Sequence, residues 1–319
     1  MDAGASHTRA LVVTPEGGIL GIGQAGGSNP FAIGAAAAAA QLRRAVRAAL
    51  ARARQPARAI ALAAIGSAGV GCDGTGRRAT ERLLSAQLPQ ARLLVEADVA
   101  AAFRAALAGA PGVVVIAGTG TIVLGRSPSG RWASAGGWGW LFGDEGSGQW
   151  LGRQAMAAAA RAEDRSGPPT RLAPLLLRHA RAASLWRLVT RAYRERWTPA
   201  QYGALAPLVT RAAAAGDLVA RRLITDAMQA LAAQIGAVAS QLRLRSPRIS
   251  YQGSVFSAGP VVLKPLRRAL AGGRLVAPAW PPLAGSFMLA LEELGVPAAA
   301  PLQGFLRHLP PDLRGIGRE

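Results

Sequence analysis

The stretch that carries most information about the fold is GGWGWLFGDEGSGQW, residues 136–150. Its six glycines let the backbone approach a ligand closely, and its tryptophans offer flat apolar faces of the kind that pack on sugar rings. Asp144 and Glu145 stand just before a helix that we predict from Ser147. An acidic N-cap with core tryptophans would account for the acids, but it would not require so many glycines. We therefore interpret the stretch as part of a ligand site.

Composition excludes several classes of protein. Of the 319 residues, 50% are hydrophobic and 17% charged, which excludes a disordered chain, and the single cysteine excludes a disulfide scaffold. The net charge of +20 comes almost entirely from arginines scattered along the predicted helices, so we expect no nucleic-acid partner. Glycines and a proline interrupt the uncharged stretch 105–125, so we expect no membrane span. No stretch near Met1 has the pattern of a signal peptide, so we expect a cytoplasmic protein.

Strands and helices alternate along the chain, which predicts an α/β fold with mixed sheets flanked by helices. Two segments, starting near residues 9 and 113, each open with a strand, a turn, a strand, a turn and a strand. This repeat predicts two domains, residues 1–111 and 112–319, the second with a helical insertion at about 164–215 and a basic tail. Only Met1 precedes the turn at Asp2, whereas a strand of about five residues is expected there, so we expect the first strand to be truncated.

Glycine-rich turns most often bind phosphates, and two known types can be tested. A P-loop is excluded, because it requires a lysine after its second glycine and Lys264 is the only lysine. Residues 69–74 match G-x-G-x-x-G between a predicted strand and helix, with Glu96 and Asp98 where an acid that binds ribose is expected. An NAD-dependent oxidoreductase is therefore an alternative hypothesis. The second match, residues 21–26, leads into a loop and lacks that acid.

The runs GGWG and GDEGS within residues 136–147 resemble the N-acetylglucosamine kinase family, which also contains the ATPase-type activators of acyl-CoA dehydratases and reductases. The resemblance covers nearly the whole chain. It implies two ribonuclease H-like (actin-like ATPase) domains with an interdomain cleft, as in the acetate kinase, sugar kinase, heat-shock ATPase and actin superfamily. The single cysteine, Cys72, argues against the activator branch, whose members bridge a cluster with more than one cysteine per chain.

Three turns match the nucleotide-binding turns of that family. They are Asp2–Thr8, Gly118–Thr121 and Gly253–Phe256. The first turn departs from the family's pattern at Ala3, Ala5 and Ser6, and the second departs from it at Thr121. The resemblance implies that ATP binds with Mg²⁺, which Asp2 would orient. It implies nucleotide contacts at Gly4, Ser6, Thr8, Gly118, Thr119, Gly120, Gly253, Ser254 and Ser257.

The resemblance further implies γ-phosphoryl transfer from ATP to an amino sugar, with N-acetylglucosamine phosphorylated at its 6-hydroxyl. Asp98 matches the general base, since a neutral alcohol needs a carboxylate to accept its proton. Sugar contacts are implied at Asn29, Asp98, Gly137, Trp138, Gly139 and Asp144. N-acetylmuramate, glucosamine and glucose remain open as substrates, and a homodimer is compatible with the sequence. A relative that senses ATP or sugar without turnover is a third hypothesis, based on the alanines in the Asp2 turn.

Overall fold

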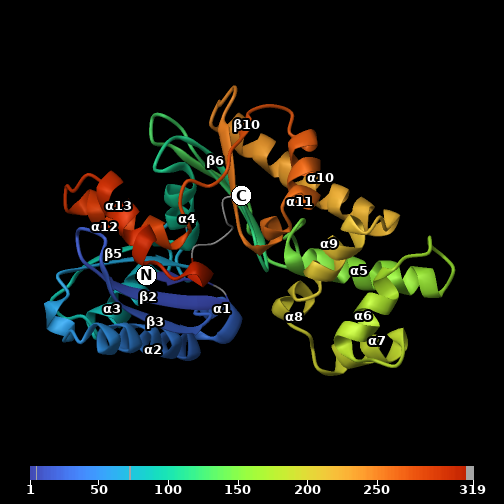
Figure 1. Ribbon diagram of the computed structural model, residues 1–319, viewed down its shortest axis with the longest axis horizontal. Helices are drawn as coiled ribbons and strands as arrows, with labels where there is room; N and C mark the ends of the chain where they lie inside the picture. Colours follow the sequence, from blue (N-terminus) through green and yellow to red (C-terminus); the bar gives the residue numbers. More distant parts are fainter. Residues whose placement is uncertain (5, 72, 314–319) are drawn as a thin grey trace. The chain divides into compact units, whose positions relative to one another are not determined.

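The computed structural model describes residues 1–4, 6–71 and 73–313, and its chain divides into two compact units (Figure 1). Unit 1 comprises residues 1–110 and the described chain from residue 278 onward, and unit 2 comprises Pro111–Ala277. Each unit contains one mixed five-stranded sheet flanked by helices. The predicted α/β fold with two domains is therefore confirmed.

The sheet of unit 1 combines antiparallel and parallel pairing. In spatial order its strands are β3 (Ile19–Gly26), β2 (His7–Val13), β1 (Asp2–Ala3), β4 (Leu62–Ser67) and β5 (Arg92–Ala97). Neighbours are antiparallel from β3 to β1 and parallel from β1 to β5. The central strand, β1, is thus also the shortest.

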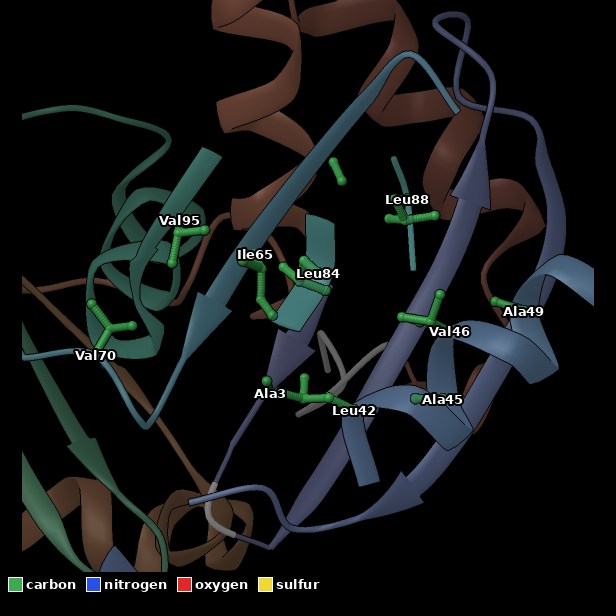
Figure 2. Packing of buried hydrophobic residues seen from close by; sticks show 12 residues of the cluster. Ala3, Leu42, Ala45, Val46, Ala49, Ile65, Val70, Leu84, Leu88 and Val95 are labelled. Carbon is green, nitrogen blue, oxygen red and sulfur yellow. The ribbon is translucent and has the colours of Figure 1, made fainter. Parts of the chain in front are cut away.

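Helices cover both faces of this sheet. On one face, α2 (Ala35–Ala53) and α3 (Arg77–Ser85) pack Leu42, Val46 and Leu84 against Ile65 of β4 (Figure 2). The opposite face carries α4 (Asp98–Leu107), α12 (Leu283–Glu293) and α13 (Ala299–His308). Three single-turn elements complete the unit: α1 (Pro30–Ile33), η1 (Ala57–Ala59) and η3 (Pro311–Leu313).

Two glycines of the 21–26 motif allow α2 to pack directly on β3. A Cβ atom on Gly23 would lie 1.9 Å from the carbonyl oxygen of Ala45, and one on Gly21 would lie 2.3 Å from that of Ala49. These distances are far below a van der Waals contact, so only glycine permits this approach. The motif therefore serves helix–sheet packing.

Unit 2 repeats the same sheet topology. Its strand order is β10 (Arg274–Leu275), β9 (Arg248–Gln252), β6 (Gly112–Ala117), β7 (Thr121–Arg126) and β8 (Trp132–Gly136). Strand β6 is antiparallel to β7 and parallel to β9, as β1 is to β2 and β4. The internal repeat predicted from the turns is thus present in the sheets.

Long helices accompany this second sheet. The longest, α10 (Leu218–Gln241), packs on β6, β7 and β8. The others are α5 (Gly148–Glu163), α6 (Leu172–Ala180), α7 (Leu185–Arg194), α8 (Pro199–Gly203), α9 (Ala206–Ala214), η2 (Ser254–Ala258) and α11 (Pro260–Ala269). Of these, α6 to α9 occupy the segment expected to be a helical insertion.

The structure differs from the sequence expectation at the end of the second domain. The predicted second domain ran to residue 319, whereas the described chain from residue 278 belongs to unit 1, because Leu302 and Phe305 bury against Leu11 and Val13 of β2. Gly34, whose φ is 81°, ends α1 and separates it from α2. Among the described residues, no helix is both long and apolar enough to cross a bilayer.

Candidate functional site

Two carboxylates occupy neighbouring parts of unit 1. Asp2 lies in β1, and Asp98 is the first residue of α4, directly after β5. Asp98 Oδ1 accepts a hydrogen bond of 2.8 Å from the backbone nitrogen of Val99. Burial, and then the negative charge of Asp2, raise the pKa of Asp98 to about 6. A carboxylate whose pKa lies close to physiological pH is suited to both accept and release a proton.

Asp2 is the candidate ligand for Mg²⁺. Burial raises its pKa, and Arg9, the N-terminal ammonium and His7 oppose that effect; the Arg9 guanidinium is 3.9 Å from Asp2 Oδ2. Among residues 1–4, 6–71 and 73–313, no three His, Cys, Asp or Glu side chains form a metal cluster. Mg²⁺ commonly uses one or two carboxylates together with water and substrate phosphates, so Asp2 fits this ion.

Hydrogen bonds of Gly4 and Thr8 fix the described part of the first predicted phosphate turn. The backbone nitrogen of Gly4 donates to the carbonyl oxygen of His7 at 3.0 Å. Thr8 is fully buried, and its hydroxyl donates to the carbonyl oxygen of Gly26 at 2.8 Å. The same hydroxyl lies 2.9 Å from the Ser28 hydroxyl, with which it forms a hydrogen bond. Thr8 thus supports the loop ahead of Asn29, whereas Ser6 is exposed.

Two of the departures from the family's first turn are alanines, Ala3 and Ala5. Ala3 lies in β1 with its methyl group in the core, and it does not have a positive φ, so alanine is unstrained there. Ala5 lies outside the described residues, as does Cys72. Ala3 therefore gives no support to the hypothesis that this turn has lost its nucleotide-binding function.

Asn29 begins the single-turn helix α1. Its Oδ1 accepts a hydrogen bond of 2.9 Å from the backbone nitrogen of Phe31, as an N-cap does. That bond does not engage the amide nitrogen of Asn29. The side chain can therefore cap the helix and still offer a donor to a ligand.

In unit 2, the second predicted phosphate turn lies between β6 and β7. The backbone nitrogen of Gly118 donates to the carbonyl oxygen of Gly120 at 2.9 Å, which closes the turn. At the first turn of α5, the nitrogen of Gly148 donates to the carbonyl oxygen of Gly118 at 2.8 Å. The turn is therefore fixed against the positive end of a helix dipole, a favourable position for anions.

Asp144 joins the 136–150 stretch to this turn. Its Oδ1 accepts a hydrogen bond of 2.9 Å from the backbone nitrogen of Thr121, and burial raises its pKa. Its φ of 63° is unusual for a residue other than glycine. A Cβ atom on Gly120 would lie 2.9 Å from Asp144 Oδ2, so the glycine makes room for the carboxylate.

The tryptophans of the stretch are not core residues. Trp138 is 77% exposed, and Trp140 lies over the guanidinium of Arg153 at 5.7 Å. Gly137 and Gly139, on either side of Trp138, have φ values of 76° and 79°. The alternative interpretation of buried tryptophans behind an acidic cap is therefore wrong for Trp138.

The third predicted turn lies beside the second. Gly253 follows β9 with a φ of 105°, and a Cβ atom on Gly118 would lie 4.0 Å from the Ser254 hydroxyl. The Ser257 hydroxyl donates to the carbonyl oxygen of Ser254 at 2.5 Å. Ser254 and Ser257 are exposed. The predicted residues thus form one group in unit 1 and one in unit 2, and the predicted interdomain cleft stays a prediction.

The sequence interpretation missed two residues near these groups. Gln149, in the first turn of α5, is fully buried, and its side-chain amide has no hydrogen-bond partner within the described chain. Ser286 of α12 donates to the carbonyl oxygen of Met1 at 2.6 Å and accepts from the nitrogen of Gly66 at 3.2 Å. Gln149 follows directly on the GDEGS run, whereas nothing in the local sequence marks Ser286.

Ser286 ties β1 to β4 next to Asp2, so we expect Ser286→Ala to lower the free energy of unfolding by about 1 kcal/mol. The effect is modest because the Gly66 nitrogen also donates to the Met1 carbonyl oxygen at 3.1 Å. Urea denaturation measures the change. Ser85→Ala, at an exposed position of α3, is the control and should change stability much less.

A protein-family model matches most of the chain. The model of the BadF/BadG/BcrA/BcrD ATPase family matches residues 1–278. The chain belongs to that ATPase family. This agrees with the resemblance found in the 136–147 run, and it gives no support to the oxidoreductase alternative based on residues 69–74.

Named sugar kinases are among the proteins that this chain resembles. The N-acetylmuramic acid/N-acetylglucosamine kinase of Clostridium acetobutylicum is 33% identical over 158 residues, 50% of this chain and 52% of that protein. The N-acetyl-D-glucosamine kinase of Dictyostelium discoideum is 36% identical over 134 residues, 42% of each chain. The matched part thus spans about half the length of these curated relatives.

A solved structure extends the similarity over nearly the whole chain. It is a candidate N-acetylglucosamine kinase from Chromobacterium violaceum, 28% identical, with a TM-score of 0.70 over 90% of this chain and 96% of that one. A glucokinase of the ROK family from Streptomyces griseus has the same fold, with a TM-score of 0.58 at 20% identity. The predicted sugar-kinase type of actin-like ATPase fold is therefore confirmed.

Proposed function

We propose that this protein transfers the γ-phosphoryl group of ATP to the 6-hydroxyl of an amino sugar, with N-acetylglucosamine as the substrate. The observation that carries the proposal is Asp98, a carboxylate directly after the edge strand β5, whose pKa is raised to about 6. Membership of an ATPase family supports ATP as the donor. The names of the two curated relatives support an N-acylated amino sugar as the acceptor.

In the proposed reaction, Asp98 accepts the proton of the sugar hydroxyl while the oxygen attacks the γ-phosphorus. The bond between that phosphorus and the bridging oxygen breaks, and ADP leaves. Asp98 then releases its proton to water. The proton transfer is needed because the attacking group is a neutral alcohol, which is a poor nucleophile until its proton is removed.

The phosphates are assigned to backbone groups and hydroxyls, since the chain has no P-loop lysine. Thr119 and Ser254 supply hydroxyls in unit 2, next to the N-terminus of α5, and Ser6 supplies one in unit 1. Asp2 would hold Mg²⁺, which when bound neutralises charge on the phosphate oxygens.

Recognition of the sugar is assigned to Asn29, Trp138 and Asp144. The amide nitrogen of Asn29 offers a donor, and the exposed Trp138 ring offers a flat apolar face. Asp144 offers acceptors, with Gly137 and Gly139 allowing close approach of the backbone. A single acyl group changes discrimination by only about 1–3 kcal/mol, so related amino sugars are expected to compete.

A coupled assay of ADP release tests this proposal. We expect turnover with N-acetylglucosamine to exceed that with glucosamine and glucose, and N-acetylmuramate tests the tolerance for a larger acyl sugar. Phosphorus NMR of the product identifies the hydroxyl that is phosphorylated. Binding of ATP and sugar without any sugar-dependent ADP release would instead support the sensing hypothesis.

The pKa of Asp98 predicts how activity depends on pH. Because the base must be ionised, kcat/KM should rise about tenfold per pH unit below about pH 6 and level off above it. Phosphate groups also titrate near pH 6, so a carbon-13 titration of the Asp98 carboxyl is the direct measurement. A midpoint near 4 for this carboxyl would contradict the prediction.

A further inference from the structure

One buried side chain of unit 2 carries a polar group that has no partner. Gln149, in the first turn of α5, is fully buried, and neither the oxygen nor the nitrogen of its side-chain amide has a hydrogen-bond partner within the described chain. Burying an amide without a partner is costly, so such groups are rare in folded proteins and call for an explanation. The residue that bears this cost directly follows the run GDEGSG, residues 143–148.

Glycines let α8 pack closely against the first turns of α5, around this side chain. A Cβ atom on Gly152 would lie 2.0 Å from the carbonyl oxygen of Tyr202, and one on Gly148 would lie 3.5 Å from that of Gly203. A Cβ atom on Gly203 would in turn lie 3.6 Å from the backbone nitrogen of Gln149. Bulk solvent therefore cannot hydrogen-bond to the Gln149 amide in this conformation.

The same turn of α5 contacts the second predicted phosphate turn. Besides the bond of 2.8 Å from the Gly148 nitrogen to the Gly118 carbonyl oxygen, the Gln149 nitrogen donates to the carbonyl oxygen of Thr119 at 3.4 Å. The second bond is longer than a typical N–H···O bond, so Thr119 is held more loosely than Gly118. Side chains of a helix lean toward its N-terminus, and this end of α5 meets the turn, so the Gln149 side chain leans toward it.

The Thr119 carbonyl group fixes the direction of a backbone donor. It belongs to the same planar peptide unit as the N–H of Gly120, and the two groups of a trans unit point in opposite directions. Because the carbonyl oxygen faces α5, the Gly120 N–H points away from α5. Backbone N–H groups of such turns bind phosphate oxygens. A firmer hold on the Thr119 carbonyl oxygen would therefore fix a donor for phosphate.

We propose that Gln149 is a positioning residue for the phosphates of ATP. When the phosphates bind, its side-chain nitrogen donates a hydrogen bond to the carbonyl oxygen of Thr119, which can accept two, and so orients the Gly120 N–H. The amide favours the ATP-bound form of the turn, because that form gives it a partner. This inference rests on the proposed function, since it requires ATP at the Gly118–Thr121 turn.

Gln149→Met tests this role, because methionine is also unbranched and flexible but lacks the amide. We expect the affinity for ATP to fall about fivefold, the effect of one lost hydrogen bond. The affinity for adenosine, which has no phosphates, should stay unchanged. Tm without ligand should not fall, since the Gln149 amide makes no hydrogen bond within the described chain. Calorimetric titration and thermal unfolding measure these effects.

Gln154→Met is the matched control. Gln154 lies on the same helix at a half-buried position, and its replacement should change neither affinity. NMR gives a second readout, because the side-chain amide signals of Gln149 can be assigned by their loss in Gln149→Met. In the parent chain these signals should shift when ATP is added and stay in place when adenosine is added.

The outcomes separate this inference from the proposed function. Unchanged ATP affinity in Gln149→Met, with a lower Tm, would make Gln149 a structural residue and overturn the inference alone. Equal losses of affinity for ATP and adenosine would also overturn it, because the effect would then not involve the phosphates. If the parent chain bound no ATP, the proposed function would be wrong and this inference with it.

Discussion

Asp98→Asn is expected to lower kcat of the proposed kinase by about 10²–10⁴-fold. The amide cannot take the proton of the sugar hydroxyl, yet it keeps the shape of the carboxylate. Its oxygen can still accept the hydrogen bond that Asp98 Oδ1 accepts from Val99. Binding of ATP and of the sugar should therefore change by only a few fold. Steady-state kinetics combined with calorimetric titration of each ligand separate the two effects.

The same variant should be more stable than the parent at pH 8. The pKa of Asp98 is raised from 3.8 to about 6 by burial and by Asp2. Because the folded state holds the proton more tightly than the unfolded chain, ionisation costs stability as the pH rises from about 4 through about 6. Asparagine removes this cost, so thermal unfolding should show a higher Tm at pH 8 and little change at pH 4.

Asp73→Asn is the control for both measurements. Asp73 is exposed and accepts hydrogen bonds from the backbone nitrogen and hydroxyl of Thr75, so its replacement should leave kcat nearly unchanged. If Asp98→Asn lost activity only in proportion to a loss of folded protein, the carboxylate would be a structural residue. If it kept full activity, the proposed base would be wrong.

Local sequence predicted the residues that we propose for the chemistry, but it did not predict the contacts that hold them in place. Asp98 could be predicted because it directly follows a predicted strand and matches the position of the general base in the family that the sequence resembles. The Gly118–Thr121 turn could be predicted because glycines there separate two apolar strands. Both features are encoded within a few consecutive residues.

The features that the sequence did not reveal depend on contacts between distant segments. The apolar pattern of α12 marks a buried helix, but it does not say which of two similar sheets the helix covers. Ser286 bonds to Met1, 285 residues away, so no local pattern could identify it. The resemblance implied a nucleotide contact for Thr8, whereas its hydroxyl donates a hydrogen bond to the hydroxyl of Ser28.

Gly253→Ala is expected to damage both the fold of unit 2 and the binding of ATP. Its φ of 105° is strained for any residue with a side chain. In addition, the new Cβ atom would lie 2.3 Å from the carbonyl oxygen of Ala117. That oxygen belongs to the backbone just before the Gly118 turn, so relief of the clash must move the turn.

We expect this variant to lose about 3 kcal/mol of unfolding free energy, the upper part of the usual range for backbone strain. The affinity for ATP should fall at least about tenfold, because the Gly118 turn and the Ser254 loop are displaced together. Denaturation curves and calorimetric titration with ATP measure the two losses.

Gly130→Ala separates the clash from the strained dihedral angle. Gly130 lies between β7 and β8 with a φ of 82°, but a Cβ atom there would meet nothing within 4 Å. This variant should therefore lose only about 1 kcal/mol and bind ATP normally. If Gly253→Ala and Gly130→Ala proved equally harmful, contact with Ala117 would not explain the effect. If Gly253→Ala destabilised unit 2 without weakening ATP binding, the third turn would not belong to the nucleotide site, because its displacement would then leave the phosphate contacts intact.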